Sequence, residues 1–401
     1  MLRIAIPLDS TFLSEVMYEG ILRYLNNGKD MRRALENVCS EDKILKGSLP
    51  LSGNDLSVKK KNRYEVRFPE KLLKLINPSV YNDELIKERI EKKENIKNLF
   101  QEEFIKGIIE SQYISQMKLS LENIVVELKK DSMLIGGDEL AAPQILKIDR
   151  YTGITSLEEE YTDKQMTLRL SKDAALLLLL GMYSSYVAYD KPYLYFLFFS
   201  PDEVINMLLG PSEQVERLIN SYFIVKNGVI NKLREIIRGL VTNEILLLEV
   251  ALGVELQELM LKENIDRVSM ILFRIAIEGN TYKVYEQVPI HVYRRPAFYE
   301  ILGTYVRDPL KFCRKLSSEL SPNKPILKAL ASFNSNNKFT EADNILKAIQ
   351  GLYRFIVLGD SEGLLEFHRE IRNAYTKLAN SSSENEKARA NYYLRLLHTL
   401  M

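Results

Sequence analysis

The sequence predicts an α+β fold, with a mixed α/β N-terminal and central body that contains an antiparallel sheet and a C-terminal helical bundle. Two observations lead to this prediction. Short alternating or aromatic apolar runs, which are typical of strands, stop before residue 295. From residue 296 onward the apolar residues recur only at helical spacing. The chain has 401 residues, of which 46% are hydrophobic, so it is long enough to build more than one core.

We therefore expect a body over residues 1–295 and a bundle over 296–401, with a subdomain break near 115–165 as an open alternative. The N-terminal segment predicts a strand over residues 2–6 and a helix over 14–26. Gly28 then separates this helix from a second one over 29–39.

Turn residues interrupt the next segment, residues 41–68, which predicts a long loop or a loose hairpin. A charged run over 82–113 has apolar residues at three- and four-residue steps and predicts an amphipathic helix. Strand patterns follow at 119–128 and 165–170, with a turn at Gly136-Gly137 between them. The middle of the chain is thus expected to mix helices and strands.

Residues 174–189 form the most apolar run of the chain, AALLLLLGMYSSYVAY. At 16 residues the run is shorter than the ~20 that cross a membrane, so it predicts a helix that is buried on most sides. Ser171 is the expected N-cap of this helix. We therefore expect no membrane segment.

An aromatic strand, YLYFLFF, is expected directly after Pro192, and it ends where Ser200 and Pro201 predict the start of a helix. Helices continue to about residue 262. The apolar run 268–277 then predicts a central strand, and Gly279-Asn280 predicts a hairpin turn into the next strand.

Beyond Pro296 we expect an antiparallel bundle of about four helices. Three helix starts are predicted from capping signals, at Thr340 with Asp343, at Ser361, and at Ser383 with Glu386. One helix has an apolar stripe that is expected to be buried. Its members are Leu364, His368, Ile371, Tyr375 and Leu378.

Motifs for catalysis are absent from the sequence. It contains no phosphate-binding glycine loop and no nucleophile elbow, and its three histidines and two cysteines are not at metal-ligand spacing. The sequence therefore predicts no enzyme, no catalytic residue, no metal site and no cofactor. One alternative stays open, a carboxylate-metal enzyme that uses paired acids. These pairs are Asp138-Glu139, residues 158–160 and Asp202-Glu203.

Charge is sorted along the chain although the net charge is only +1. Residues 1–80 contain 14 basic and 10 acidic side chains, and residues 281–401 contain 18 and 12, so the middle is acidic. Two basic clusters are candidates for phosphate contacts. The first is a run in the turn-rich segment, Lys59, Lys60, Lys61 and Arg63. The second is Arg294 and Arg295 at a helix start, with Arg307, Lys311, Arg314 and Lys315 expected on one helix face.

Three parts of the chain together resemble the large subunit of the archaeal type I-A CRISPR interference (Cascade) complex. They are the N-terminal MLRIAIPLDSTFLSEVMYEGILRYL, the central LSKDAALLLLLGMYSSYVAYDKPYLYFLFFSPDEV and the helical C-terminal part. The resemblance implies a non-catalytic subunit in antiviral defence that contacts guide RNA and target DNA and helps to read the flanking motif. It also implies partners, namely the backbone subunits, the small subunit and a helicase-nuclease.

Two features add to this hypothesis. The few cysteines and the N-terminus, which lacks an unbroken apolar core, favour the cytoplasm. Abundant Lys, Glu, Ile and Leu with no Trp resemble thermophile usage. The competing hypothesis is a thermophile protein-protein scaffold or adaptor that binds no nucleic acid.

Overall fold

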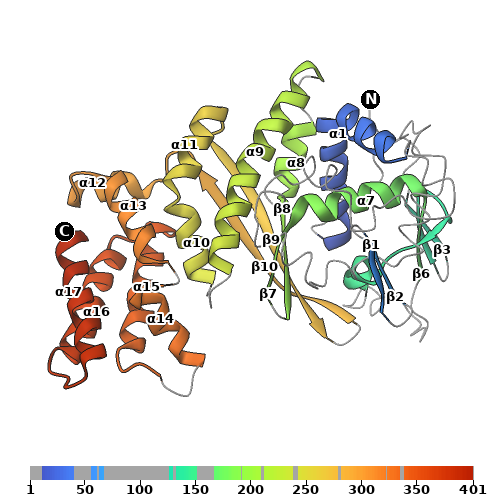
Figure 1. The fold of residues 1–401 in the computed structure, drawn as a ribbon. Helices are drawn as coiled ribbons and strands as arrows, with labels where there is room; N and C mark the ends of the chain where they lie inside the picture. The colour runs from blue at the N-terminus through green and yellow to red at the C-terminus, as the bar shows by residue number, and fades with distance from the viewer. Residues whose placement is uncertain are drawn as a thin grey trace. The chain divides into compact units, whose positions relative to one another are not determined.

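The computed structural model describes residues 11–39, 56–60, 63–66, 126–129, 132–150, 167–190, 192–208, 212–237, 243–278, 281–321, 323–334 and 338–400. The chain divides into two compact units, and Figure 1 labels the helices and strands. The first contains Met1–Asn220 with Met270–Gln287, and the second contains Ser221–Ser269 with Val288–Met401. An antiparallel sheet in the central region and helices at the C-terminal end confirm the predicted α+β class.

Two helices, α1 (Phe12–Cys39) and α7 (Lys172–Ser185), pack together in the first unit. Helix α1 is continuous, so the predicted break at Gly28 is wrong. A single glycine costs a helix only about 1 kcal/mol, which is too little to end one of 28 residues. The predicted cap of α7 is confirmed, because Ser171 Oγ accepts a hydrogen bond from the Ala174 amide at 3.2 Å.

Glycines allow α1 and α7 to approach each other closely. A Cβ atom at Gly20 would lie 2.0 Å from the Leu177 carbonyl oxygen, and one at Gly181 would lie 1.8 Å from that of Val16. Any larger residue at either position would therefore force the two helices apart.

A buried polar cluster lies at the same helix pair. Arg23 Nε donates to Ser184 Oγ at 2.6 Å, and Ser184 Oγ in turn donates to the Glu19 carboxylate. All three residues are buried. Burial lowers the pKa of Arg23 to about 10, and Glu19 opposes this change. Arg23 is therefore held in a dry site by a neighbouring carboxylate.

The apolar run at 174–189 does not remain helical to its end. Helix α7 stops at Ser185, whose Oγ donates to the Gly181 carbonyl at 2.7 Å, and strand β7 (Tyr186–Asp190) begins at once. The expected single helix is thus too long. The reason is that Tyr186 and Val187 are good strand formers and find a partner strand in β8 (Tyr193–Phe199).

The central sheet has the strand order β10-β9-β8-β7. Besides β7 and β8 it contains β9 (Arg267–Glu278) and β10 (Thr281–Tyr293). The strands expected from the sequence are observed here, since β8 is the aromatic strand and β9 the apolar one. The Phe12 ring of α1 contacts Phe196, Phe198 and Phe273 with centroids 5.3, 5.6 and 5.7 Å apart. Helix α1 therefore covers one face of this sheet.

A second, smaller sheet of the first unit has the order β3-β4-β6-β5 and is mixed, because β4 and β6 pair in parallel. Its strands are β3 (Val126–Lys129), β4 (Ser132–Ile135), β5 (Leu140–Ala141) and β6 (Thr167–Leu170). Gly136 has a φ of 70° at the predicted turn. The 3-10 helix η4 (Gln144–Arg150) follows β5.

Helix α8 (Pro201–Leu208) begins at the predicted proline. The Ser200 hydroxyl makes no capping bond to this helix, because it is buried without a hydrogen-bond partner among the described residues. Helix α9 (Ser212–Ile237) follows, and its residues are divided between the two units.

In the described residues of the second unit, the ends of β9 and β10 are the strands and the other elements are helices. Its helices are α10 (Asn243–Ala251), α11 (Val254–Glu263), α12 (Phe298–Tyr305), α13 (Pro309–Glu319), α14 (Pro325–Ala331), η6 (Ser332–Asn334), α15 (Ala342–Ile356), α16 (Glu362–Ala379) and α17 (Glu384–Leu400). One apolar core joins residues of α10, such as Leu248, to residues of α15 and α16, such as Leu352 and Phe367. The boundary expected at 295 and 296 thus falls inside this unit, because helices before β9 share its core.

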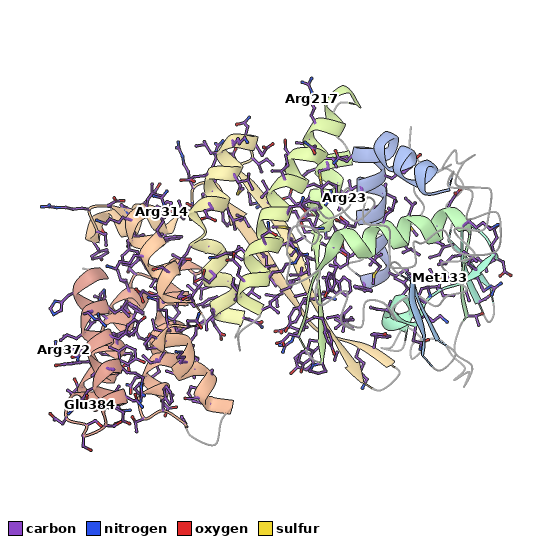
Figure 2. The ribbon with its side chains drawn as sticks, in the orientation of Figure 1. Arg23, Met133, Arg217, Arg314, Arg372 and Glu384 are labelled. Atoms are coloured by element: carbon purple, nitrogen blue, oxygen red, sulfur yellow. The ribbon has the colours of Figure 1, made fainter. Side chains whose placement is uncertain are left out.

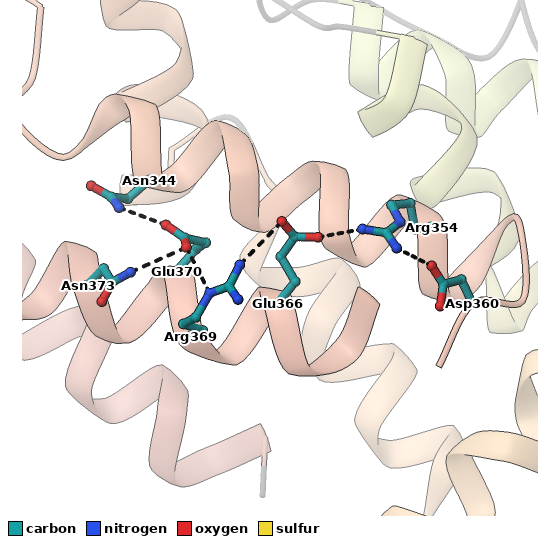
Figure 3. A network of polar contacts seen from close by, with 7 residues as sticks. All are labelled: Asn344, Arg354, Asp360, Glu366, Arg369, Glu370 and Asn373. Atoms are coloured by element: carbon teal, nitrogen blue, oxygen red, sulfur yellow. Dashed lines mark hydrogen bonds and ion pairs between the residues drawn. The ribbon is translucent and has the colours of Figure 1, made fainter. Parts of the chain in front are cut away.

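Helices α15 and α16 meet at Gly351 and Gly363, where a Cβ atom on Gly363 would lie 2.2 Å from the Gly351 carbonyl oxygen. A chain of ion pairs and hydrogen bonds follows this contact (Figure 3). Arg354 binds Asp360 and, at 2.8 Å, Glu366, while Asn344 donates to Glu370 at 2.8 Å.

The three predicted C-terminal caps have different outcomes. Glu341 rather than Thr340 is the N-cap of α15. Ser361 is the N-cap of α16 as predicted, but its side chain makes no capping hydrogen bond. Glu386 receives its bond from Ser381 instead of closing a box with Ser383. The helices nevertheless begin near the predicted positions, because their buried faces rather than their caps hold them.

The apolar stripe of α16 is confirmed for Leu364, Ile371 and Leu378, which are buried. His368 and Tyr375 lie at its margin and are only half-buried. Within the described ranges, no helix is long and apolar enough to cross a membrane.

Some of the predicted elements cannot be compared with the structure. The strand expected at 2–6, the helix expected at 82–113 and the turn expected at 279–280 lie outside the described residues.

Candidate nucleic-acid interface

The first basic cluster lies on a β-hairpin formed by β1 (Leu56–Lys60) and β2 (Arg63–Val66). Lys59 and Lys60 end β1, and Arg63 begins β2 directly opposite Lys60. Lys61 lies outside the described residues. Of the two expectations for this segment, the hairpin is the one observed, and it pairs Lys60 with Arg63 across its two strands.

Arg294 and Arg295 follow the end of β10 and have different environments. Arg294 forms an ion pair with Asp266, and its Nη1 lies 3.3 Å from Asn264 Oδ1. Its amide also donates to the Asp266 carbonyl at 2.9 Å. Arg294 therefore fastens β10 to the turn after α11, whereas Arg295 is exposed.

The four remaining cations do not share a helix face as predicted. Arg307 precedes α13, and the next residue, Asp308, is the N-cap of that helix. Asp308 Oδ1 accepts a hydrogen bond from the Lys311 amide at 3.0 Å, and Pro309 starts the helix. The prediction of a single helix face is thus wrong for Arg307, because Asp308 and Pro309 begin the helix after this residue. The cations that do lie on α13 are Lys311, Arg314 and Lys315.

Arg314 is exposed on α13 (Figure 2) and forms an ion pair with Glu258 of α11 at 2.8 Å. Both side chains are more than half exposed, at 61% and 63%. Such a surface pair contributes little to stability, in the range of about 0–1 kcal/mol. Arg314 is therefore able to exchange Glu258 for a phosphate.

Four cations of the C-terminal cluster form no ion pair within the described part of the chain. They are Arg295, Arg307, Lys311 and Lys315. Both Arg307, which precedes α13, and Lys311, in its first turn, are exposed. The arrangement is suited to binding phosphate groups, because no described carboxylate forms an ion pair with these four side chains.

The paired acids singled out from the sequence are used in other ways. Asp138 forms an ion pair with Arg169 at 2.5 Å, and Glu139 accepts a hydrogen bond from the Lys172 amide at 2.9 Å. Glu203 is buried, and residues 158–160 lie outside the described residues. Across the described part of the chain, no group of three or more His, Cys, Asp or Glu residues is placed to hold a metal ion.

Two histidines have defined neighbours. The His291 Nδ1 atom lies 3.0 Å from Ser269 Oγ, between β10 and β9. Burial lowers the pKa of His368, and its Nδ1 has no hydrogen-bond partner among the described residues. Cys313 is buried, and burial raises the pKa of its thiol to about 12, which leaves the thiol protonated at neutral pH.

One group of residues escaped the sequence analysis. Arg274 of β9 lies among Tyr193, Tyr195 and Tyr285, with its guanidinium carbon 3.9 Å from the centroid of the Tyr193 ring. The alternation within YLYFLFF places Tyr193 and Tyr195 on one face of the strand, and this was the only sign of the group in the sequence. The sequence alone does not show that the strands with Arg274 and Tyr285 lie beside this one.

Comparison with known proteins finds a relative along nearly the whole chain. An uncharacterized protein from Archaeoglobus fulgidus is 41% identical to the chain over an aligned length of 414 positions. The alignment covers 98% of each protein. The chain belongs to the same family as this protein. No family model matches the chain, and no solved structure matches it.

Proposed function

We propose that the chain is the non-catalytic large subunit of a type I-A CRISPR RNA-guided surveillance complex in the cytoplasm of an archaeon. In this role it contacts guide RNA and target DNA, including the flanking motif, beside backbone and small subunits, and it recruits a helicase-nuclease. The observation that carries the proposal is the pair of exposed cations, Arg307 and Lys311, that have no described carboxylate partner. The relative from Archaeoglobus fulgidus agrees with an archaeal source.

The physical demands on such a subunit are modest. Base pairing between guide and target reads the sequence, so the protein supplies phosphate contacts and a few side chains that read a groove. Arg307 and Lys311 are suited to the phosphate contacts. The hairpin that contains Lys59, Lys60 and Arg63 is a two-stranded ribbon, which is an element that the major groove admits.

A charge-reversal experiment tests the phosphate contacts. The test variant is Arg307→Glu with Lys311→Glu, and the control is Arg372→Glu with Lys377→Glu, which changes the net charge equally at two exposed positions of α16. Affinity for a DNA duplex is measured by fluorescence anisotropy between about 50 and 200 mM salt.

The proposal predicts that only the test variant loses affinity. Two lost phosphate contacts would flatten the slope of log affinity against log salt by about 1.8. Equal losses in both variants would reduce the effect to net charge, and unchanged binding in the test variant would overturn the assignment of Arg307 and Lys311.

One observation favours the scaffold alternative. Leu358 lies at the turn between α15 and α16 and is 64% exposed. Leu365 lies on α16 and is 67% exposed. Exposed leucines that lie near each other in the sequence are typical of a surface that binds protein. A pure scaffold would purify with protein partners and without an absorbance excess at 260 nm, whereas the guide-complex subunit would purify with RNA.

A further inference from the structure

The central sheet presents a tyrosine-arginine face, which we define as Tyr193 and Tyr195 of β8, Arg274 of β9 and Tyr285 of β10. Tyr195 and Arg274 are directly paired across the two antiparallel strands, so their side chains lie on the same face. Tyr193 lies two residues before Tyr195 and shares this face. The opposite face contains Phe196 and Phe198, which pack against α1.

The side chains of this face are in close contact. The Arg274 guanidinium carbon lies 3.9 Å from the Tyr193 centroid and 5.0 Å from that of Tyr285. The Tyr193 and Tyr285 centroids are 5.1 Å apart, and the two rings are tilted by 51°. Tyr195 is buried, but Tyr285 is 61% exposed. The group of rings around Arg274 therefore begins in the sheet and ends with an open aromatic ring.

Internal packing accounts for only part of this arrangement. Arg274 on Tyr193 covers apolar surface and stabilises the sheet. The exposed ring of Tyr285, however, adds little burial where it stands, and the Nε–H of Arg274 is buried without a hydrogen-bond acceptor among the described residues. A flat group laid on this face would cover Tyr285 and add to its ring contacts.

The charges on the face are nearly balanced. Arg274 pairs with Glu286 at 3.6 Å, and exposed Lys283 lies two residues before Tyr285. Asp190 is paired with Tyr193 across β7 and β8. Phosphate is therefore attracted weakly here, and ring stacking is the interaction that this face offers.

We propose that the tyrosine-arginine face stacks on the bases of single-stranded nucleic acid, an inference that rests on the proposed function. Aromatic rings stack on every base type, so such a site has little sequence preference. Single strands fit because the base faces of a duplex are already stacked on one another and are closed to a protein ring. Guide RNA and a displaced DNA strand offer the same chemistry.

The absence of tryptophan from the chain makes a direct test possible. Tyr285→Trp in the full chain introduces a single reporter on the face, and Leu365→Trp introduces a control reporter at an exposed position of α16. The probes are an RNA and a DNA 12-mer of mixed sequence and the duplex form of the DNA. Stacking quenches tryptophan emission, so the Tyr285→Trp variant is expected to lose emission with either single strand and not with the duplex.

Affinity measurements on two further variants complete the test. Tyr285→Ala is expected to weaken single-strand binding about tenfold, while Tyr285→Phe, which keeps the ring, retains it. Neither changes the dependence of binding on salt. A preference for the RNA or the DNA probe would indicate which strand occupies the face.

The outcomes separate this inference from the function on which it rests. If Tyr285→Ala binds single strands like the wild type while Arg307→Glu with Lys311→Glu binds them weakly, the stacking site is wrong and the proposed function stands. If the wild type binds none of the probes, both are overturned. Quenching in Leu365→Trp equal to that in Tyr285→Trp would also overturn the site.

Discussion

The sheet of the first unit and the helices of the second unit hold their arginines in different ways. Arg274 lies against tyrosine rings, and its ion pair with Glu286 is long, at 3.6 Å. Arg354 of α15, in contrast, is bound by two carboxylates, Asp360 and Glu366 (Figure 3). The charge of Arg354 is thus neutralised by two carboxylates. The surroundings of Arg274 are mainly aromatic rings, and another flat group can reach them.

The same distinction applies inside the basic segment. Arg294 and Arg314 both have carboxylate partners, while Arg295 and Arg307 have none among the described residues. A count of basic residues in the sequence therefore overstates how many are ready to bind phosphate. Whether a cation can bind phosphate depends on its carboxylate partners, and these partners come from distant parts of the chain.

The largest effect is expected at the buried arginine. Arg23→Met would leave the Glu19 carboxylate buried beside a neutral side chain, so we expect a loss of about 3–5 kcal/mol in the free energy of unfolding. Arg354→Met removes a solvent-screened network instead and should cost much less. Urea unfolding of both variants measures the contrast.

The double variant Glu19→Leu with Arg23→Met serves as control for the first prediction. Because it removes both charges, it should recover part of the loss. Equal losses for Arg23→Met and Arg354→Met would show that burial does not distinguish the two arginines.

The next largest effect concerns the basic hairpin. Reversal of Lys59, Lys60, Lys61 and Arg63 to glutamate is expected to weaken binding of the target duplex by more than about tenfold and to flatten its salt dependence, because phosphate contacts release counterions. Anisotropy titrations at several salt concentrations measure both changes. If all four reversals leave binding as it was, the hairpin does not read the groove.

A smaller effect is expected from Arg274→Lys, which keeps the positive charge and removes the planar group that stacks on Tyr193. Single-strand affinity should fall about threefold, with an unchanged salt dependence. A steeper or flatter salt dependence would mean that Arg274 binds phosphate and that stacking is not its role.

The smallest effect concerns pH. Burial lowers the pKa of His368 in the folded protein below its ordinary value of 6.5. The folded state thus binds fewer protons than the unfolded one below pH 6.5. The contribution of neutral His368 to the free energy of unfolding is therefore fully present above pH 6.5 and is lost as the pH falls through the lowered pKa. His368→Gln should make the melting temperature less sensitive to pH between about 7 and 5, as measured by circular dichroism; an identical pH dependence in both proteins would contradict this.

Local patterns in the sequence predicted much of the fold. The aromatic strand β8, the apolar strand β9 and the Ser171 cap of α7 depend on neighbouring residues, and all three are observed. Features that depend on distant contacts were missed. Helix α1 continues through Gly28, and the core of the C-terminal helices includes α10, because tertiary packing overrides local signals.

The candidate site was less predictable than the fold. Helical spacing placed Arg307 on α13, but Asp308 and Pro309 start the helix after it. The ion pair between Arg314 and Glu258 joins residues 56 positions apart, and the stack of Tyr193 on Arg274 joins two strands that are far apart in the chain. No short-range pattern encodes such contacts.

The central claim is that the chain works in a complex built on a guide RNA, and a pull-down of the tagged protein from its native host tests it most directly. Copurifying nucleic acid is sized and sequenced, and partner proteins are identified in the same sample. The account predicts a small RNA of uniform length with repeat-derived ends, together with the other subunits of the complex. A sample that contains protein partners but no RNA would contradict the account and favour the scaffold.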